Sequence, residues 1–281
     1  MEWWQSLVLG LVEGLTEYLP VSSTGHLLLA QRAMGIASSD SADAFAICIQ
    51  AGAILAVLGL YFTRVRQMTM GMLGRDPAGF RMSMNVVAAF LPAALVGLVL
   101  EKPIKKYLFG GDAWGLWPTV AAWFVGGIAI LAVSWWVAAR KDALKPRMGL
   151  DGLTWKLAIV IGLVQCLAMW PGTSRSLVTI AGGLLIGLSL PAAVEFSFLL
   201  GVVTLTAATA YDGLKYGKEM LEAFGPTSLI IGFVAAWISA VLAVKWMVGY
   251  LNRNGMEIFG YYRIALGLVV AGLIWSGWLR H

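Results

Sequence analysis

The sequence predicts an all-α integral membrane protein with six transmembrane helices and two re-entrant helical hairpins, arranged as an inverted-topology repeat. Of its 281 residues, 59% are hydrophobic and only 12% are charged, whereas soluble domains carry about 25% charged residues. Several apolar runs approach the roughly 20 residues with which a helix crosses the hydrocarbon core. These runs are apolar on every face and do not alternate, which indicates helices and excludes barrel strands.

Six uninterrupted apolar runs are expected to cross the bilayer. They are residues 44–62, 83–101, 118–138, 194–212, 228–250 and 259–279. Two further apolar regions, 3–34 and 155–188, are interrupted near the middle by LPVSSTG and WPGTSRS. Proline, glycine and small hydroxyl residues end a helix, and unpaired backbone at membrane depth is tolerated only inside protein or beside water. Each interrupted region is therefore expected to enter the membrane and turn back.

The loops predict how the spans are oriented. Loops 63–82 and 139–156 are rich in arginine and lysine and are expected on the cytoplasmic side. Loops 102–117 and 213–227 mix lysine with acidic residues and are expected outside. This assignment opens the first hairpin to the outside and the second to the cytoplasm. Since lipid topology explains the basic residues behind the net charge of +5, no nucleic-acid partner is predicted.

Residues 1–281 are predicted to form a single membrane domain with internal repeats at about 1–140 and 150–281. The segment GLVEGLTEYLPVSS, from Gly10, aligns with GLVQCLAMWPGTS, from Gly162, with one gap. Each half holds one broken hairpin and three crossings, an odd number, so the second copy is expected to be inverted. Such repeats bring two broken hairpins together near the midplane, where these folds bind their ligand.

Two acidic residues lie in the first hairpin. Glu13 and Glu17 are four residues apart, so a helix places both on one face. A charged carboxylate near the bilayer centre costs about 2.5–3.5 kcal/mol, which makes an intramembrane acid a functional candidate. Paired carboxylates suit a hard divalent cation, Mg²⁺ or Ca²⁺, bound alongside phosphate oxygens. In the alternative interpretation, the carboxylates only reach water at the membrane interface.

The turn of the first hairpin contains Ser22, Ser23, Thr24 and His26. One of these hydroxyls can cap the second arm, but three exceed what a cap requires. The start of a helix also offers free N–H groups and a positive dipole end to phosphate. His26 follows Ser23 by three residues, so its imidazole is expected to reach back toward that hydroxyl. A serine nucleophile needs such a base.

Arg175 is the charged residue at the break of the second hairpin, between Ser174 and Ser176. Its planar guanidinium is suited to binding phosphate through two hydrogen bonds. The alternative role is a buried salt bridge to Glu13 or Glu17. Together, the polar residues of the two hairpins predict a site for an anionic phosphate on an apolar tail.

The role of Glu195, at the start of EFSFLL, is left open by the sequence. It is either a carboxylate near a helix N-terminus or a partner of Arg175.

The motifs EGLTEYLPVSSTGH (residues 13–26) and PGTSRS (residues 171–176) resemble the two signature motifs of the undecaprenyl-diphosphate phosphatase family, of the bacitracin-resistance type. The resemblance covers essentially the whole chain. It implies a bacterial inner-membrane enzyme that removes the terminal phosphate of undecaprenyl diphosphate, which recycles the lipid carrier for peptidoglycan synthesis. It also implies a homodimer, embedded in bilayer lipids, with its active site facing the periplasm.

The family's functional residues match this chain without substitution. They are Glu13, Glu17, Ser23, His26 and Arg175. Thr24 and Ser174 match positions implicated near the phosphates, and Ser22 and Ser176 complete the predicted substrate-binding set. Thr173 stands where some relatives carry an aromatic residue, a difference expected to alter packing and not chemistry.

The mechanism expected on this basis has Arg175 and a divalent cation held by Glu13 and Glu17 neutralise the diphosphate. Ser23 then attacks the terminal phosphorus, with His26 or a glutamate as base, and water hydrolyses the phosphoserine. In a second route, metal-bound water attacks and Ser23 only holds the phosphate. A different class of function also fits the sequence, because inverted repeats with broken helices are a transporter architecture: a prenyl-phosphate transporter or flippase.

Overall fold

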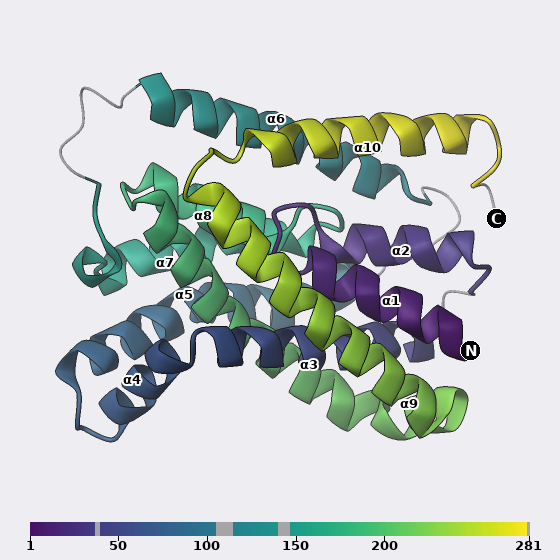
Figure 1. Ribbon diagram of the computed structural model, residues 1–281, viewed down its shortest axis with the longest axis horizontal. Coiled ribbons are helices and arrows are strands. Elements are labelled where there is room, and N and C mark those ends of the chain that lie inside the picture. Colours follow the sequence, from purple (N-terminus) through teal and green to yellow (C-terminus); the bar gives the residue numbers. More distant parts are fainter. Residues whose placement is uncertain (37–39, 105–114, 140–146, 280–281) are drawn as a thin grey trace.

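The protein is helical throughout the segments that the computed structural model describes, which are residues 1–36, 40–104, 115–139 and 147–279 (Figure 1). The α-helices are α1 (Trp3–Thr16), α2 (Ser23–Ala33), α3 (Asp40–Leu60), α4 (Phe62–Met72), α5 (Pro77–Ile104), α6 (Trp117–Ala139), α7 (Trp155–Gln165), α8 (Arg175–Leu185), α9 (Leu190–Leu251) and α10 (Glu257–Trp275). Two short 3₁₀ helices, η2 (Leu150–Gly152) and η3 (Cys166–Met169), flank α7. The described segments contain no strand, which confirms the all-α prediction.

Four helices, α5, α6, α9 and α10, are long and apolar enough to cross a membrane. A fifth candidate span consists of α3 and α4, which are bent by 85° relative to one another. These helices overlap all six predicted spans. Large apolar side chains such as Leu98, Val125 and Trp135 are exposed on them, as a surface in contact with lipid requires. The chain is therefore a multi-pass membrane protein, while the layout of six crossings and two re-entrant hairpins stays a prediction.

Two of the predicted loops are largely helical. Residues 63–82 contain α4 and the start of α5, and residues 213–227 belong to α9, which is broken only at Gly225, where φ is +70° and Pro226 follows. The charges in these segments indicated loops, but segments such as LKYGKEMLEAF consist mainly of good helix formers. Residues 105–114 of the predicted loop 102–117 and residues 140–146 of the predicted loop 139–156 lie outside the described residues.

The two interrupted regions form pairs of short helices. The first pair is α1 and α2, and the second is α7, extended by η3, and α8. At 1.5 Å per residue, α1, α2, α7 and α8 measure about 16–21 Å each, so none alone spans a core about 30 Å thick. Both second arms begin in the same way, at a serine with positive φ: Ser22 (+77°) and Ser174 (+76°). Each serine hydroxyl accepts a 3.3 Å hydrogen bond from a backbone N–H of the first turn.

The packing of the helices places the two breaks in the middle of the bundle. α1 and α3 both pack along α9, and α6 pairs with α10 on the other side of the broken helices (Figure 1). α1 approaches α9 closely because Gly14 has no side chain; a Cβ there would overlap the backbone of Ala236. Small residues at such crossings allow close helix packing within a membrane. The breaks of the two pairs meet where the Ser176 hydroxyl donates to the Leu19 carbonyl over 2.8 Å.

Candidate active site

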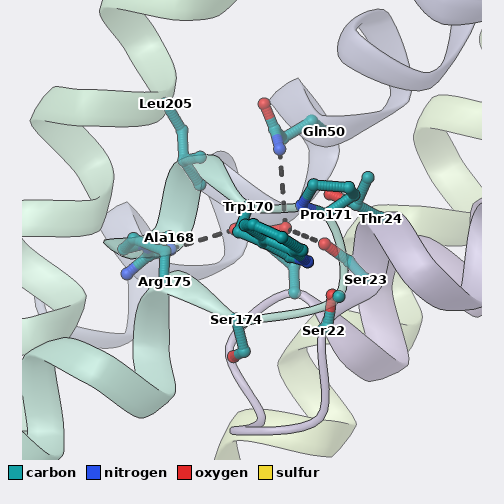
Figure 2. A pocket seen from close by; sticks show the side chains of 12 residues that line it. Ser22, Ser23, Thr24, Gln50, Ala168, Trp170, Pro171, Ser174, Arg175 and Leu205 are labelled. Carbon is teal, nitrogen blue, oxygen red and sulfur yellow. Dashed lines mark hydrogen bonds and ion pairs between the residues drawn. The ribbon is translucent and has the colours of Figure 1, made fainter. Parts of the chain in front are cut away.

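A polar cavity of about 110 Å³ lies where the two breaks meet (Figure 2). It is lined by residues of α2, α3, η3, α8, α9 and the two connecting segments, namely Glu17, Ser22, Ser23, Thr24, Gln50, Ala168, Trp170, Pro171, Gly172, Ser174, Arg175 and Leu205. Six of the nine predicted site residues line it. Glu13, His26 and Ser176 do not.

Glu17 connects the two broken helices within this cavity. Its Oε2 accepts a 2.5 Å hydrogen bond from the Ser23 hydroxyl, and its Oε1 pairs with Arg175 Nη2 at 3.0 Å. Gln50 Nε2, from α3, approaches Oε2 at 3.5 Å, so three groups from separate elements converge on one carboxylate (Figure 2). The side chain of Glu17 is only 5% exposed and that of Arg175 10% exposed. This ion pair is therefore shielded from water and weakly screened by salt.

Arg175 is held in place by two further contacts. Its Nη1 donates to the Ser197 carbonyl at 2.9 Å, and its guanidinium carbon lies 5.4 Å from the centre of the Tyr18 ring. A Cβ at Gly201 would overlap the guanidinium, so α9 leaves room for it only because residue 201 is glycine. Arg175 Nε is buried without a hydrogen-bond partner in the described structure. The side chain therefore keeps a free donor while its charge is directed at Glu17.

Glu13 lies behind Glu17 and is 1% exposed. Its carboxyl group is within hydrogen-bonding reach of the Glu17 and Gln50 side chains, while its Oε1 has no partner among the described residues. The described residues contain no cluster of three or more His, Cys, Asp or Glu side chains. Two carboxylates with a spare oxygen nonetheless suit a hard divalent cation, and Mg²⁺ in particular is usually bound through one or two carboxylates together with substrate phosphates.

The hydroxyl residues divide into different roles. Ser22 and Ser174 cap α2 and α8, as described above, and Ser174 also exchanges a 2.9 Å hydrogen bond with Ser176. Thr24 is the exposed member of the group and lines the cavity. Ser23 therefore differs from its neighbours, because its hydroxyl contacts a carboxylate.

His26 does not contact Ser23, contrary to the expectation from the spacing. Its Nδ1 lies 2.7 Å from the Ser22 carbonyl, and its Nε2 lies 2.7 Å from the Tyr262 hydroxyl. The imidazole stacks on the Tyr262 ring and meets Trp123 edge-on. The physical reason is local: Ser22 is the N-cap of α2, so its carbonyl points along the helix to residue 26 and contacts both the backbone N–H and Nδ1 of His26.

Two residues that were not singled out in the sequence, the half-buried Gln50 and the buried Arg263, belong to this region. Gln50 contacts Glu17, and Arg263 of α10, which is 0% exposed, donates to backbone carbonyls of both connecting segments. Both interrupt apolar runs, which is the signal that marks a functional residue in a membrane helix. Glu195 is paired with Arg64 of α4 at 2.6 Å, which settles its partner in favour of Arg64.

The fold and the site thus define a class of protein: a multi-pass helical membrane protein with a buried serine, carboxylate and arginine site between two broken helices. The chain belongs to the family described as bacitracin resistance protein BacA, whose model matches residues 6–269.

Curated relatives cover nearly the whole chain. "Undecaprenyl-diphosphatase 2" of Rhodospirillum rubrum is 44% identical over 97% of this chain and 95% of its own length. "Undecaprenyl-diphosphatase" of Methylococcus capsulatus is 46% identical over 98% of both chains. The protein of the same name from Nitrosospira multiformis is 41% identical over 100% of this chain and 99% of its own.

Proposed function

We propose that the protein is a membrane phosphatase that hydrolyses undecaprenyl diphosphate to undecaprenyl phosphate and inorganic phosphate. The observation that carries this proposal is the 2.5 Å hydrogen bond from the Ser23 hydroxyl to Glu17, beside the Arg175 guanidinium. A nucleophile, a base and a phosphate-binding cation are the groups that phosphoryl transfer requires. The names of the curated relatives supply the substrate.

Binding of the diphosphate is assigned to the lining of the cavity. The first turns of α2 and α8 begin there, so their N–H groups and positive dipole ends favour phosphate oxygens. Arg175 adds a charge and a planar pair of donors. Thr24 offers an exposed hydroxyl at the same place. The cavity is small and polar, so it is assigned to the phosphates and not to the tail.

The chemical step follows from the contact between Ser23 and Glu17. The Glu17 carboxylate takes the hydroxyl proton while Ser23 Oγ forms a bond to the terminal phosphorus. The bond from that phosphorus to the bridging oxygen breaks, and undecaprenyl phosphate leaves with the electron pair. Water then attacks the phosphoserine while Glu17 returns its proton to Ser23 Oγ, which releases inorganic phosphate and restores both the Ser23 hydroxyl and the Glu17 carboxylate. Glu17 is assigned as the base because His26 is engaged elsewhere.

A divalent cation is proposed as cofactor, held by Glu13 and Glu17. It would neutralise charge on the phosphate oxygens, which is the main electrostatic demand of phosphoryl transfer. Both residues are buried beside the cavity, and the spare oxygen of Glu13 supports this assignment.

The cellular setting is proposed in line with the substrate. The enzyme is assigned to the bacterial inner membrane as a homodimer with its site open to the periplasm, where it recycles the lipid carrier for cell-wall synthesis. The charge pattern of the loops supports this orientation.

The proposal is tested with purified protein in detergent and undecaprenyl diphosphate. We expect release of one phosphate per lipid and none from the monophosphate. Arg175→Ala should abolish the release, whereas Arg64→Ala, which removes a partly exposed ion pair on α4, should retain it. Intact diphosphate moved across proteoliposomes with no phosphate released would overturn the proposal.

A further inference from the structure

Arg263 connects the two broken helices through their backbones. Its Nη1 donates to the Pro20 carbonyl at 3.2 Å, and its Nη2 donates to the Gly172 and Ala122 carbonyls at 2.8 Å each. Pro20 lies in the break between α1 and α2, and Gly172 lies in the break between η3 and α8. One side chain of α10 therefore spans both breaks and α6.

The burial of this arginine requires an explanation. It is 0% exposed, and in the described part of the chain it forms no salt bridge with a carboxylate. Removing a charge from water costs several kcal/mol unless hydrogen bonds compensate. The compensation here comes from three carbonyl groups. Those of Pro20 and Gly172 lie in the helix breaks, where they would otherwise be unpaired at membrane depth, and that of Ala122 lies within α6.

The surroundings are shaped to admit the guanidinium. A Cβ at Gly126 of α6 would overlap Nη2, so the space exists because residue 126 is glycine. Neighbouring side chains contact the other backbone carbonyls of the first break. Trp123 Nε1 donates to the Val21 carbonyl, Ser176 donates to the Leu19 carbonyl, and His26 engages Ser22. Arg263 is the member of this set that also reaches the second break.

We propose that Arg263 is a positioning residue for the phosphatase reaction, an inference that rests on the proposed function. By binding Pro20 and Gly172 at once, it fixes the register of the first break, which carries Ser23, against the second break, which carries Arg175. Phosphoryl transfer depends on the alignment of the Ser23 hydroxyl with the Arg175 guanidinium, and misplacement of a catalytic group by about 1 Å costs about 100-fold in rate.

The test compares four variants for phosphate release. Arg263→Lys keeps the charge but cannot serve three carbonyls with a planar fork, and Arg263→Gln removes the charge. Gly126→Ala keeps the arginine at position 263 but displaces its guanidinium, because the new methyl group would overlap it. Asn85→Ala is the matched control, because it removes a buried 2.7 Å hydrogen bond to the carbonyl of Leu153, which precedes α7 at the end of that helix away from the break.

We expect Arg263→Lys, Arg263→Gln and Gly126→Ala to lower kcat by about tenfold to 100-fold. KM should stay within about threefold of the wild-type value, because burial of the apolar tail provides binding that does not depend on the relative position of the two breaks. Asn85→Ala should retain kcat even where its melting temperature falls as far as that of the others. Normal kcat in folded Arg263→Gln, or an equal loss in Asn85→Ala, would overturn the proposal.

A second measurement separates this inference from the proposed function. Spin labels at Ala33→Cys and Leu185→Cys, exposed positions near the ends of α2 and α8, report the distance between the second arms in a background without Cys48 and Cys166. The Arg263 and Gly126 variants should broaden or shift the distance distribution, and Asn85→Ala should not. If the wild-type protein releases no phosphate, the proposed function fails, and the distances alone then decide whether Arg263 sets the register; unchanged distances refute it.

Discussion

Ser23 and Glu17 share a 2.5 Å hydrogen bond although they lie on different elements, α2 and the end of α1. The chain reverses between them through Pro20 and Val21, and the left-handed Ser22 completes the turn. The other Glu17 oxygen is paired with Arg175, so the carboxylate is fixed from both sides. In the proposed reaction, this arrangement gives Ser23 a base before substrate arrives.

Glu17→Gln keeps the size of the side chain and can still accept a hydrogen bond from Ser23, but it cannot take the proton. We expect kcat to fall by about 10²–10⁴-fold, the usual contribution of a positioned general base. Phosphate release under saturating substrate measures it. Glu222→Gln, an exposed change near Lys218 on α9, serves as control. Retention of most of the wild-type rate in Glu17→Gln would assign the base elsewhere.

Ser23→Ala removes the proposed nucleophile, and we expect a loss of at least about 10³-fold in kcat. Ser83→Ala, which deletes a buried hydroxyl bonded within α5 and to α4, should remain active. Wild-type enzyme quenched during turnover should carry phosphate on Ser23 by mass spectrometry. An unmodified Ser23, together with substantial activity of Ser23→Ala, would favour direct attack by water.

Gly201→Ala tests the placement of Arg175 without changing a polar residue. The new methyl group would overlap the guanidinium, so we expect kcat/KM to fall by about 100-fold, as in other cases of misplaced catalytic groups. Gly217→Ala is the matched control on the same helix, because nothing lies within 4 Å of its Cβ. Equal activities of the two variants would show that Arg175 tolerates displacement.

Removal of divalent cations with a chelator should abolish phosphate release, and added Mg²⁺ or Ca²⁺ should restore it. Glu13→Gln is expected to raise the cation concentration needed for half-maximal activity by about tenfold or more, because one of two carboxylate ligands is lost. A titration of activity against free Mg²⁺ measures the shift. Full activity in the chelator would contradict the proposed cofactor.

Two variants of His26 distinguish a structural role of its imidazole from a role in proton transfer. Asparagine can place an amide N–H near the position of Nδ1, so His26→Asn should preserve the contact with the Ser22 carbonyl and retain more activity than His26→Ala. If His26 were the general base, both variants would lose activity equally. Rates for the two proteins, measured at one pH, decide between these roles, and equal loss would favour His26 as the base.

The sequence alone was sufficient for the class of fold, and six of the nine site residues that it predicted line the polar cavity. Composition and apolar runs predicted helices because backbone groups in lipid must be paired within the segment. The breaks at LPVSSTG and WPGTSRS also followed from local chemistry, since proline, glycine and hydroxyl residues act on their own backbone. The prediction of a loop at 213–227 was wrong, because the charges in this segment were given more weight than its helix propensity.

Tertiary structure decided which of these groups meet. His26 is three residues from Ser23 and Glu17 is six residues away, yet the hydroxyl contacts Glu17, while the imidazole contacts the Ser22 carbonyl and the Tyr262 hydroxyl. Gln50 and Arg263 join the region through helix packing over long separations in the chain. Spacing determines which side chains share a helix face, but contacts across a broken helix depend on the packing of α6, α9 and α10 around it.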